Sequence, residues 1–465
     1  MSRPRYLIET FGCQMNVHDS ERMEGLLEQA GYERAASDRD AAVVVINTCS
    51  VRDHAEEKLY TRLGQLRVLE EETGRSRVLA VAGCVAQQEG DALFKNTNGR
   101  LIDVVLGTHR LKMLPALVER ARASAGHGHR EVDVARFDDV TFPVGVTRRG
   151  DAVRAYVTII EGCNDHCAFC VVPTTRGHER MRAKADILLD VREAVASGRK
   201  EIQLLGQIVN HYQAPDDPQC DFAQLLAEVD QVPGVERIRF ASPHPRHTGA
   251  RLIEAIRDLP RVCKHLHLPL QSGSTEVLRR MRRRHTREEY LELVGRIRAT
   301  LPGVTLSTDL IVGFPGETTR DFDDTLSLVE AVRYHSIFSF KYSERPNTLA
   351  ARRMPDDVSE AEKTARIVAL QSRQKEIQAE LHAEVVGRVV EGLVDSVSRR
   401  REAELSGRTS GNTVVNFPAP PGALVDPDLW LGRAVPILVT RAGPHSVAGE
   451  LAAPQAAVPA GVVTC

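Results

Sequence analysis

The sequence predicts an α/β protein in three parts: an N-terminal doubly wound α/β domain, a central partial (β/α)6 barrel and a C-terminal small β-barrel. Alternating strands and helices predict the first two parts, and a change to short strands after Gly387 predicts the third. Cysteines also follow several strand ends, where parallel α/β folds bind their ligands. A chain of 465 residues is expected to form two to four domains of about 150 residues each.

The composition argues against several classes of protein. The net charge of −2 gives no global nucleic-acid signal, and the single tryptophan argues against a broad base-stacking surface. The N-terminus lacks the apolar core of a signal peptide, and no run of about 18 apolar residues predicts a membrane span. The odd number of nine cysteines favours reduced thiols or metal ligands over disulfides, so we expect a cytoplasmic protein.

The first part is predicted to span residues 3–121. Its strands are expected at 5–10, 41–47, 77–82 and 102–106, and its helices at 16–30 and 53–73. The second strand is continuously apolar, which is typical of a parallel strand buried on both faces. Residues 122–148 show little periodicity and are predicted to be a linker.

Three cysteines of the first part follow three successive strands: Cys13, Cys49 and Cys84. Because the carboxyl ends of parallel strands meet at one edge of the sheet, these thiols are expected to converge. Gly12 and Gly83 would let the backbone turn tightly beside them. One buried cysteine would be ordinary, but three at the same topological position favour a 4Fe–4S site.

The central part is predicted to span residues 149–378. Strands are expected at 155–160, 202–205, 237–241, 265–269, 305–312 and 337–342. Helices are expected at 185–197, 221–229 and 318–331, with a long charged helix at 360–386. Six parallel strands fit a partial (β/α)6 barrel, in which chemistry takes place at the carboxyl ends of the strands.

The first strand of the barrel leads into a cysteine-rich loop. Cys163, Cys167 and Cys170 have the spacing C-x3-C-x2-C. Three thiolates can hold three irons of a 4Fe–4S cube and leave the fourth iron open to a ligand. The alternative is a structural zinc site that also uses His166 or His178. Zinc sites usually combine C-x2-C pairs, and the sequence has no second pair, so iron–sulfur chemistry is favoured.

Other strand ends of the barrel carry glycine-containing loops at 206–207, 242–245, 269–273 and 313–317, and glycine admits a ligand close to the backbone. A basic segment follows the third of these loops and contains Arg279, Arg280, Arg282, Arg283, Arg284 and Arg287. It is either a solvated helix face or a set of phosphate contacts.

The third part is predicted to span residues 379–446, with strands at 388–396, 413–417 and 434–440. Its basic residues include the run Arg399–Arg401 and Arg408, but its charges nearly balance. Residues 447–465 are predicted to be a frayed tail that contains Cys465. Cys220 and Cys263 are isolated and are not expected to be metal ligands.

The order of these parts resembles the radical S-adenosylmethionine (SAM) methylthiotransferases, which carry an N-terminal three-cysteine domain, a radical-SAM core and a TRAM domain. The resemblance covers residues 3–442. It rests on the sequences TFGCQMN at 10–16, NTCSVR at 47–52, EGC at 161–163, VVPTTRG at 171–177, FKYSERP at 340–346 and GRT at 407–409. Ile208 stands where the family pattern has Asn, and Asn347 stands where it has Gly.

The resemblance implies a transferase that inserts sulfur and then a methyl group at C2 of N6-dimethylallyladenosine, next to the anticodon at position 37 of tRNA. One SAM would be the radical source and another the methyl donor. It implies two 4Fe–4S clusters, a SAM-binding one on Cys163, Cys167 and Cys170 and an auxiliary one on Cys13, Cys49 and Cys84. Candidate SAM contacts are Gly206, Gln207, Ser242, Gln271 and Asp309. Candidate RNA contacts are Arg399, Arg400, Arg401 and Arg408. The expected partners are the modified tRNA, an electron donor and a sulfur donor, and the expected state is a monomer.

Three alternatives stay open at this point. Sister branches of the family modify an aspartate of a ribosomal protein or a threonylcarbamoyl-adenosine in tRNA. The residues Gln14-Met15-Asn16 after Cys13 resemble the isopentenyl-adenosine branch more closely. A non-catalytic RNA-binding protein with structural metal sites belongs to a different class, and iron content together with SAM cleavage would distinguish it.

Overall fold

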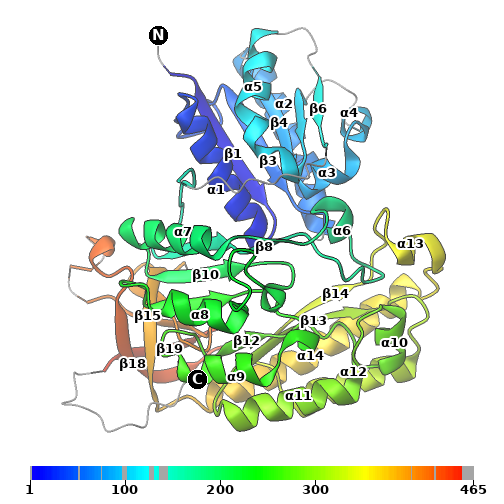
Figure 1. The fold of residues 1–465 in the computed structure, drawn as a ribbon, viewed down its shortest axis with the longest axis vertical. Helices are drawn as coiled ribbons and strands as arrows, with labels where there is room; N and C mark the ends of the chain where they lie inside the picture. The colour runs from blue at the N-terminus through cyan, green and yellow to red at the C-terminus, as the bar shows by residue number, and fades with distance from the viewer. Residues whose placement is uncertain are drawn as a thin grey trace. The chain divides into compact units, whose positions relative to one another are not determined.

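The computed structural model describes residues 3–50, 53–74, 76–96, 102–124, 130–135, 145–399, 401–420, 422–423 and 426–452. The chain forms two compact units, and Figure 1 labels their helices and strands. The first unit contains Met1–Gly150 together with Ile160–Asp165 and Cys170–Arg182. The second contains Asp151–Ile159, His166–Phe169 and Ala183–Cys465.

The first unit is built on a six-stranded parallel sheet in the order β2-β1-β3-β4-β5-β6. Its strands are β1 (Arg5–Phe11), β2 (Glu33–Arg34), β3 (Val43–Thr48), β4 (Val78–Gly83), β5 (Val104–Leu106) and β6 (Glu131–Asp133). Its main helices are α1 (Gln14–Gln29), α2 (Asp53–Thr73), α3 (Cys84–Glu89), α4 (Ala92–Asn96) and α5 (Leu114–Ala123). A short antiparallel pair, β8 (Ile160–Glu161) and β9 (Arg180–Met181), and helix α6 (Val172–Thr175) complete it.

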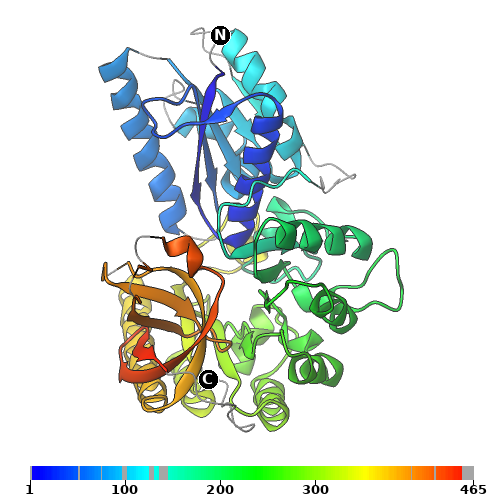
Figure 2. The ribbon, with the colours of Figure 1, turned by 90° about the vertical axis from the view of Figure 1, so that its left-hand side faces the viewer.

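Helices cover both faces of this sheet, as Figure 2 shows for α1 and α2. Along β3, Val43 and Val45 pack into a core with α1 and α5, whereas Val44 and Ile46 pack into a second core with α2 and α3. Because successive side chains of a strand point to opposite faces, a strand that is covered on both sides must be apolar throughout. The predicted doubly wound α/β domain is confirmed.

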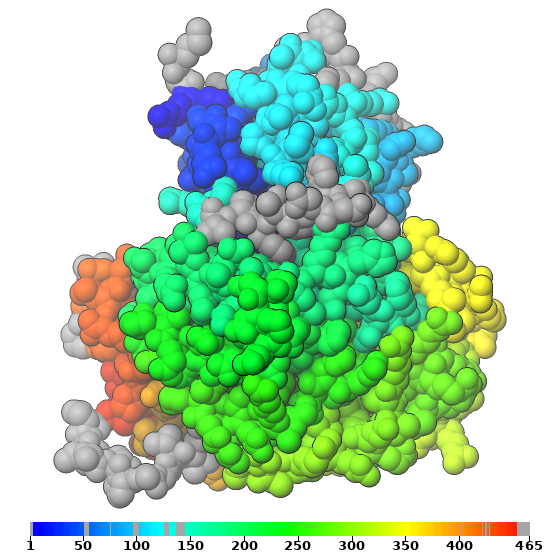
Figure 3. All heavy atoms as spheres, in the orientation of Figure 1, coloured from blue at the N-terminus to red at the C-terminus, as the bar shows by residue number. Residues whose placement is uncertain are grey.

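The second unit carries the predicted partial (β/α)6 barrel. One parallel sheet contains β7 (Arg154–Thr158), β10 (Glu201–Leu205) and β11 (Arg237–Phe240); the other contains β12 (His265–His267), β13 (Thr305–Val312) and β14 (Ser336–Lys341). A single parallel bridge between Ile238 and Val262 joins them. The helices of the barrel are α7 (Lys184–Ala196), α8 (Phe222–Asp230), α9 (Ala250–Asp258), α10 (Thr275–Arg280), α11 (Arg287–Thr300), α12 (Thr319–Val332) and α13 (Leu349–Arg353). Green residues from this region form much of the surface of the second unit in the view of Figure 3.

Helix α14 (Glu360–Ala383) leads from the barrel into a closed five-stranded barrel of order β15-β16-β17-β19-β18. Its strands are β15 (Val389–Val397), β16 (Glu404–Arg408), β17 (Val414–Pro418), β18 (Ala434–Ala442) and β19 (Val447–Leu451). Val394, Leu405, Val415 and Phe417 fill its interior. Within the described ranges, no helix is both long and apolar enough to cross a membrane.

Two sequence-based expectations are wrong. Residues 122–148 were expected to be irregular, but Glu131–Asp133 form β6 and pair with β5. Residues 447–465 were expected to be a tail, but Val447–Leu451 form β19, which pairs with β17 and β18 and closes the small barrel. Short strands carry little apolar pattern of their own, and their pairing with a neighbouring strand decides whether they form.

Candidate functional site

The structure brings the three cysteines of the first unit together. Cys13 directly precedes α1, Cys49 directly follows β3, and Cys84 begins α3 directly after β4. The strands β1, β3 and β4 are neighbours in a parallel sheet, so these three strand ends lie at one edge. Cys13 and Cys49 are joined by a hydrogen bond. The three cysteines therefore follow neighbouring strand ends at one edge of the sheet.

The environment favours negative charge on the sulfur of Cys13, whereas burial disfavours it on the sulfur of Cys84. The hydrogen bond with Cys49 lowers the pKa of Cys13 to about 6 against the effect of burial, and the charge of Arg176 also lowers it. Burial raises the pKa of Cys84, which Arg176 opposes by its charge and a hydrogen bond. Arg176 is buried and is held by Asp19 at 2.6 Å. A thiolate is the form of cysteine that binds metal, so a buried guanidinium stabilises the ligand state. No pattern in the sequence predicts this role of Arg176.

Glycines shape the turns that carry these cysteines. Gly83 has φ of 94°, and a Cβ atom there would lie 2.2 Å from Oδ1 of Asn47. A Cβ atom on Gly12 would lie 2.6 Å from Oδ1 of Asn16. Asn16 donates in turn to Oδ1 of Asn47 at 3.1 Å. The asparagine pair therefore ties the turn that carries Cys13 to the end of β3 that leads into Cys49, and Gly83 lets the turn before Cys84 pack closely against this pair.

The loop after β8 carries the second cysteine trio, and each of its sulfurs accepts a hydrogen bond. The amide of Asp165 donates to Sγ of Cys163 at 3.4 Å, and the amide of Val172 donates to Sγ of Cys170 at 3.5 Å. The third sulfur, of Cys167, accepts from a guanidinium at 3.6 Å. Hydrogen bonds to the ligand sulfurs are a feature of iron–sulfur sites.

Both trios fit a cluster by their donor chemistry. Among the described residues, no three His, Cys, Asp or Glu side chains are placed to hold a single metal ion. A 4Fe–4S cube takes each thiolate on a different iron and does not require such convergence on one point.

Two of the candidate SAM contacts have an unusual backbone conformation. Ser242, after β11, has φ of 61°, and Gln271, after β12, has φ of 80°. Backbone hydrogen bonds hold Gln271 in place, since its amide donates to the carbonyl of Asp309 and its carbonyl accepts from Ile311, both at 2.8 Å. Non-glycine residues in left-handed conformations cost about 1–3 kcal/mol and cluster at functional sites. The sequence carries no signal for this strain.

The other three candidate SAM contacts also lie on the second unit. Gly206 and Gln207 follow β10, and Oε1 of Gln207 is buried without a hydrogen-bond partner in the described part of the chain. Asp309 lies within β13 rather than after it, and its carboxylate is 3.4 Å from Nε2 of His267. A buried acceptor without a partner in the protein fits a donor group of a ligand.

A hairpin of the small barrel docks onto the starts of the strands of the larger barrel. The turn between β16 and β17 offers the carbonyls of Thr409 and Ser410, which accept from Arg239 of β11 at 2.7 and 3.2 Å. The carbonyl of Gly411 accepts from the hydroxyl of Thr305 at 2.7 Å. Charged and neutral hydrogen bonds therefore attach the C-terminal barrel firmly to the core.

The candidate RNA contacts fall into two groups. Arg399 and Arg401 are exposed at the other hairpin of the small barrel, between β15 and β16, and Arg401 pairs with Glu404 at 2.8 Å. Arg400 lies outside the described residues. Arg408 is half-buried beside the docked turn, 3.4 Å from the carboxylate of Asp395.

The arginines of the basic segment at 279–287 also fall into two groups, those that contact the rest of the protein and those that are exposed. Arg280 donates to the carbonyl of Gly316 at 2.6 Å, and Arg287 donates to that of Gly273 at 3.1 Å. Arg283 is buried. The exposed members are Arg279, Arg282 and Arg284. Half of the segment is therefore structural, and the other half lies at the surface, where Arg279 pairs with Glu276.

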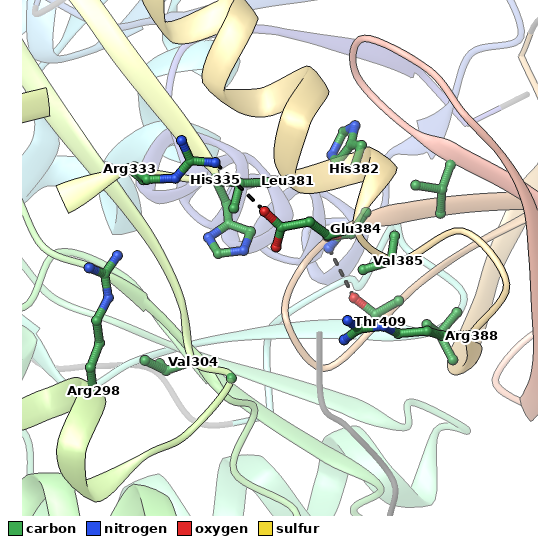
Figure 4. A pocket seen from close by; sticks show the side chains of 14 residues that line it. Arg298, Val304, Arg333, His335, Leu381, His382, Glu384, Val385, Arg388 and Thr409 are labelled. Atoms are coloured by element: carbon green, nitrogen blue, oxygen red, sulfur yellow. Dashed lines mark hydrogen bonds and ion pairs between the residues drawn. The ribbon is translucent and has the colours of Figure 1, made fainter. Parts of the chain in front are cut away.

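A cavity of about 440 Å³ lies within the second unit (Figure 4). Val304 and His335, which directly precede β13 and β14, line it together with Arg298, Arg388 and Thr409. Burial lowers the pKa of His335 to about 4, so this side chain is neutral at neutral pH. The cavity therefore lies at the amino-terminal ends of the strands, whereas chemistry in such barrels takes place at the carboxyl ends.

Comparison with known proteins identifies the three parts. Residues 5–107 match "Uncharacterized protein family UPF0004", residues 157–329 match "Radical SAM superfamily" and residues 384–452 match "TRAM domain". Among solved structures, the radical S-adenosylmethionine methyltransferase TsrM from Kitasatospora setae aligns with a TM-score of 0.52 and 15% identity, covering 76% of this chain and 77% of that chain. The cobalamin-dependent radical enzyme OxsB aligns with a TM-score of 0.53 and 11% identity, covering 81% and 62%. These structures support the fold alone.

Curated relatives extend over nearly the whole chain. The tRNA-2-methylthio-N(6)-dimethylallyladenosine synthase of Geotalea uraniireducens is 44% identical over 97% of this chain and 100% of its own length. The enzyme of the same name from Frankia alni is 45% identical over 97% and 89%. The fold and the cysteine loop define a radical-SAM enzyme with a C-terminal TRAM domain. The chain belongs to the family of tRNA-2-methylthio-N(6)-dimethylallyladenosine synthases.

Proposed function

We propose that this protein converts N6-dimethylallyladenosine, next to the anticodon of tRNA, to 2-methylthio-N6-dimethylallyladenosine. The relatives carry the name of this activity over nearly the full length of the chain. The structural observation that carries the proposal is the presence of two separate thiol trios, one at the carboxyl edge of the first sheet and one on the loop after β8. The C–H bond at C2 of adenine is inert to acid–base chemistry, so its replacement by sulfur needs a radical.

Each trio is assigned one 4Fe–4S cluster. The SAM-binding cluster is assigned to Cys163, Cys167 and Cys170, and the auxiliary cluster to Cys13, Cys49 and Cys84. When bound, the clusters supply the electron that cleaves SAM and the iron site that carries the sulfur. The protein stabilises the negative charge of the ligand sulfurs. Hydrogen bonds come from the amides of Asp165 and Val172, and a positive charge comes from the guanidinium of Arg176.

The SAM site is assigned to the carboxyl ends of the barrel strands, with Gly206, Gln207, Ser242, Gln271 and Asp309 as contacts. The left-handed conformations of Ser242 and Gln271 support this assignment, because a strained backbone at strand ends is a common feature of ligand sites. The free acceptor on Gln207 could take a hydrogen bond from the amino group of a bound SAM.

We assign tRNA binding to the small barrel through Arg399, Arg400, Arg401 and Arg408. The exposure of Arg399 and Arg401 supports phosphate contact, and the docked turn at Thr409–Gly411 would hold the barrel in a fixed position on the core. The proposed domain boundaries are 3–121, 149–378 and 379–452. We further propose a monomeric cytoplasmic enzyme that receives electrons and sulfur from separate donors.

The decisive test offers the reconstituted enzyme, with SAM, sulfide and a reductant, three substrates: isopentenylated tRNA, unmodified tRNA and a ribosomal protein. Nucleoside analysis should detect a methylthio group at C2 only on the first substrate. A variant with Cys163, Cys167 and Cys170 changed to Ala serves as the control; it should hold about half of the iron and lack activity. Turnover of unmodified tRNA or of the protein would assign the chain to a different substrate. A protein that binds zinc and does not cleave SAM would instead be a binding protein.

A further inference from the structure

Arg283 presents a buried positive charge beside a cysteine sulfur. The residue is 7% exposed. Its Nη1 donates to Sγ of Cys167 at 3.6 Å, and its Nη2 donates to the carbonyl of Pro269 at 2.8 Å. In the described part of the molecule, no carboxylate lies within ion-pair distance of this guanidinium, and its Nε is buried without a hydrogen-bond partner. A buried charge without a counter-ion is costly, so a negative group is expected beside it.

The local backbone holds Arg283 in this place. The amide of Ala168, which follows Cys167, donates to the carbonyl of Met281 at 2.9 Å, so the cysteine loop is tied to the segment that carries the arginine. Arg282 and Arg284 have φ of 59° and 56°, and the amide of Arg283 donates to the carbonyl of Leu278 at 3.0 Å. Two strained residues that flank a buried cation indicate that the turn is maintained for that cation.

The two histidines next to Arg283 do not supply a positive charge. Burial, with the charge of Arg283, lowers the pKa of His244 to about 2 and that of His285 to about 4. The two imidazole rings lie 5.7 Å apart, and both are neutral at neutral pH. Arg283 is therefore the buried cation of this group, and Cys167 is the group beside it that becomes anionic as a metal ligand.

We propose that Arg283 is a positioning residue that raises the reduction potential of the cluster held by Cys167 and so permits electron transfer to it. This inference rests on the proposed function, because it assumes that the cysteine loop holds a 4Fe–4S cluster. One-electron reduction adds one negative charge and breaks no bond. A fixed cation and an N–H donor at a ligand sulfur favour the more negative state, and both are recognised ways in which a protein tunes such a cluster.

The test uses the full chain with Cys13, Cys49 and Cys84 changed to Ala, so that only the loop cluster remains. After anaerobic reconstitution, the midpoint potential is measured by a redox titration followed by electron paramagnetic resonance. Arg283→Gln should reduce the equilibrium constant for reduction at least tenfold, which corresponds to 59 mV for one electron. Arg283→Lys keeps the positive charge, so its midpoint potential should lie close to that of the parent protein. Arg279→Gln is the matched control, because Arg279 belongs to the same segment but is exposed and paired with Glu276.

A second measurement does not depend on the stability of the Gln variant. With ¹⁵N-labelled arginine, the reduced cluster should show a weak ¹⁵N coupling that is lost in Arg283→Lys. An unchanged potential in Arg283→Gln, or the absence of this coupling from the parent protein, would overturn the proposal. A parent protein that binds no iron on the loop would refute the cluster assignment itself, so the two failures are distinguishable.

Discussion

Glu201 is a buried carboxylate of the central barrel that forms ion pairs with arginines on the two neighbouring strands. It lies at the start of β10, is 1% exposed and accepts from Nε of Arg154 at 2.5 Å and from Nε of Arg239 at 2.8 Å. Burial alone would raise its pKa, but the charges of Arg239 and Arg154 lower it from 4.5 to about 2. At 1.36 kcal/mol per pKa unit, the charged form contributes about 3 kcal/mol to stability at neutral pH.

Glu201→Gln should therefore lower the free energy of unfolding by about 3 kcal/mol, because it leaves the buried Arg239 and the half-buried Arg154 without their counter-ion. The melting temperature should fall by roughly 6–12 °C. Because the folded pKa is depressed, this stability is fully present above pH 4.5 and is lost as the pH falls through about 2. The difference in the free energy of unfolding between the parent protein and Glu201→Gln should shrink over the same pH interval.

Chemical denaturation followed by circular dichroism and by the fluorescence of Trp430, the only tryptophan, measures this effect. Trp430 packs against the core of the small barrel, so its signal also reports whether the loss of Glu201 releases that barrel. Glu236→Gln is the control, since Glu236 is exposed and only 4.0 Å from Lys200; it should change stability by less than about 0.5 kcal/mol. A loss below about 1 kcal/mol in Glu201→Gln would refute the reasoning.

Three further outcomes are expected. Gly83→Ala should remove about half of the bound iron, because the new Cβ would lie 2.2 Å from an amide oxygen, whereas Gly64→Ala, in open space on α2, should keep it. Arg399→Gln and Arg401→Gln should each reduce the slope of log Kd for tRNA against log salt by about 0.7–0.9, without changing SAM cleavage in the absence of tRNA; an unchanged slope would make them ordinary surface residues. Gln271→Gly should weaken SAM binding in equilibrium dialysis but change stability by less than about 1 kcal/mol, since relief of strain offsets the added chain entropy; unchanged affinity would contradict the assigned contact.

The sequence by itself determined the class of each part and the grouping of the first three cysteines. A strand such as Val43–Thr48 is apolar at every position because it is covered on both faces, and this pattern is local. Because the carboxyl ends of parallel strands lie at one edge of a sheet, the sequence alone predicts that Cys13, Cys49 and Cys84 lie close together. The spacing of the loop cysteines is likewise contained in ten residues of sequence.

Tertiary structure alone decided the features that depend on partners distant in the chain. The strands β6 and β19 exist because a neighbouring strand supplies their hydrogen bonds, and their own residues carry almost no pattern. An arginine in a basic run can face solvent, phosphate or a sulfur atom, and only the fold placed Arg283 beside Cys167 and left Arg279 at the surface. The fold brings Arg176 to the first thiol trio from a segment more than 90 residues away, and its charge matters there because burial has removed the water that would screen it.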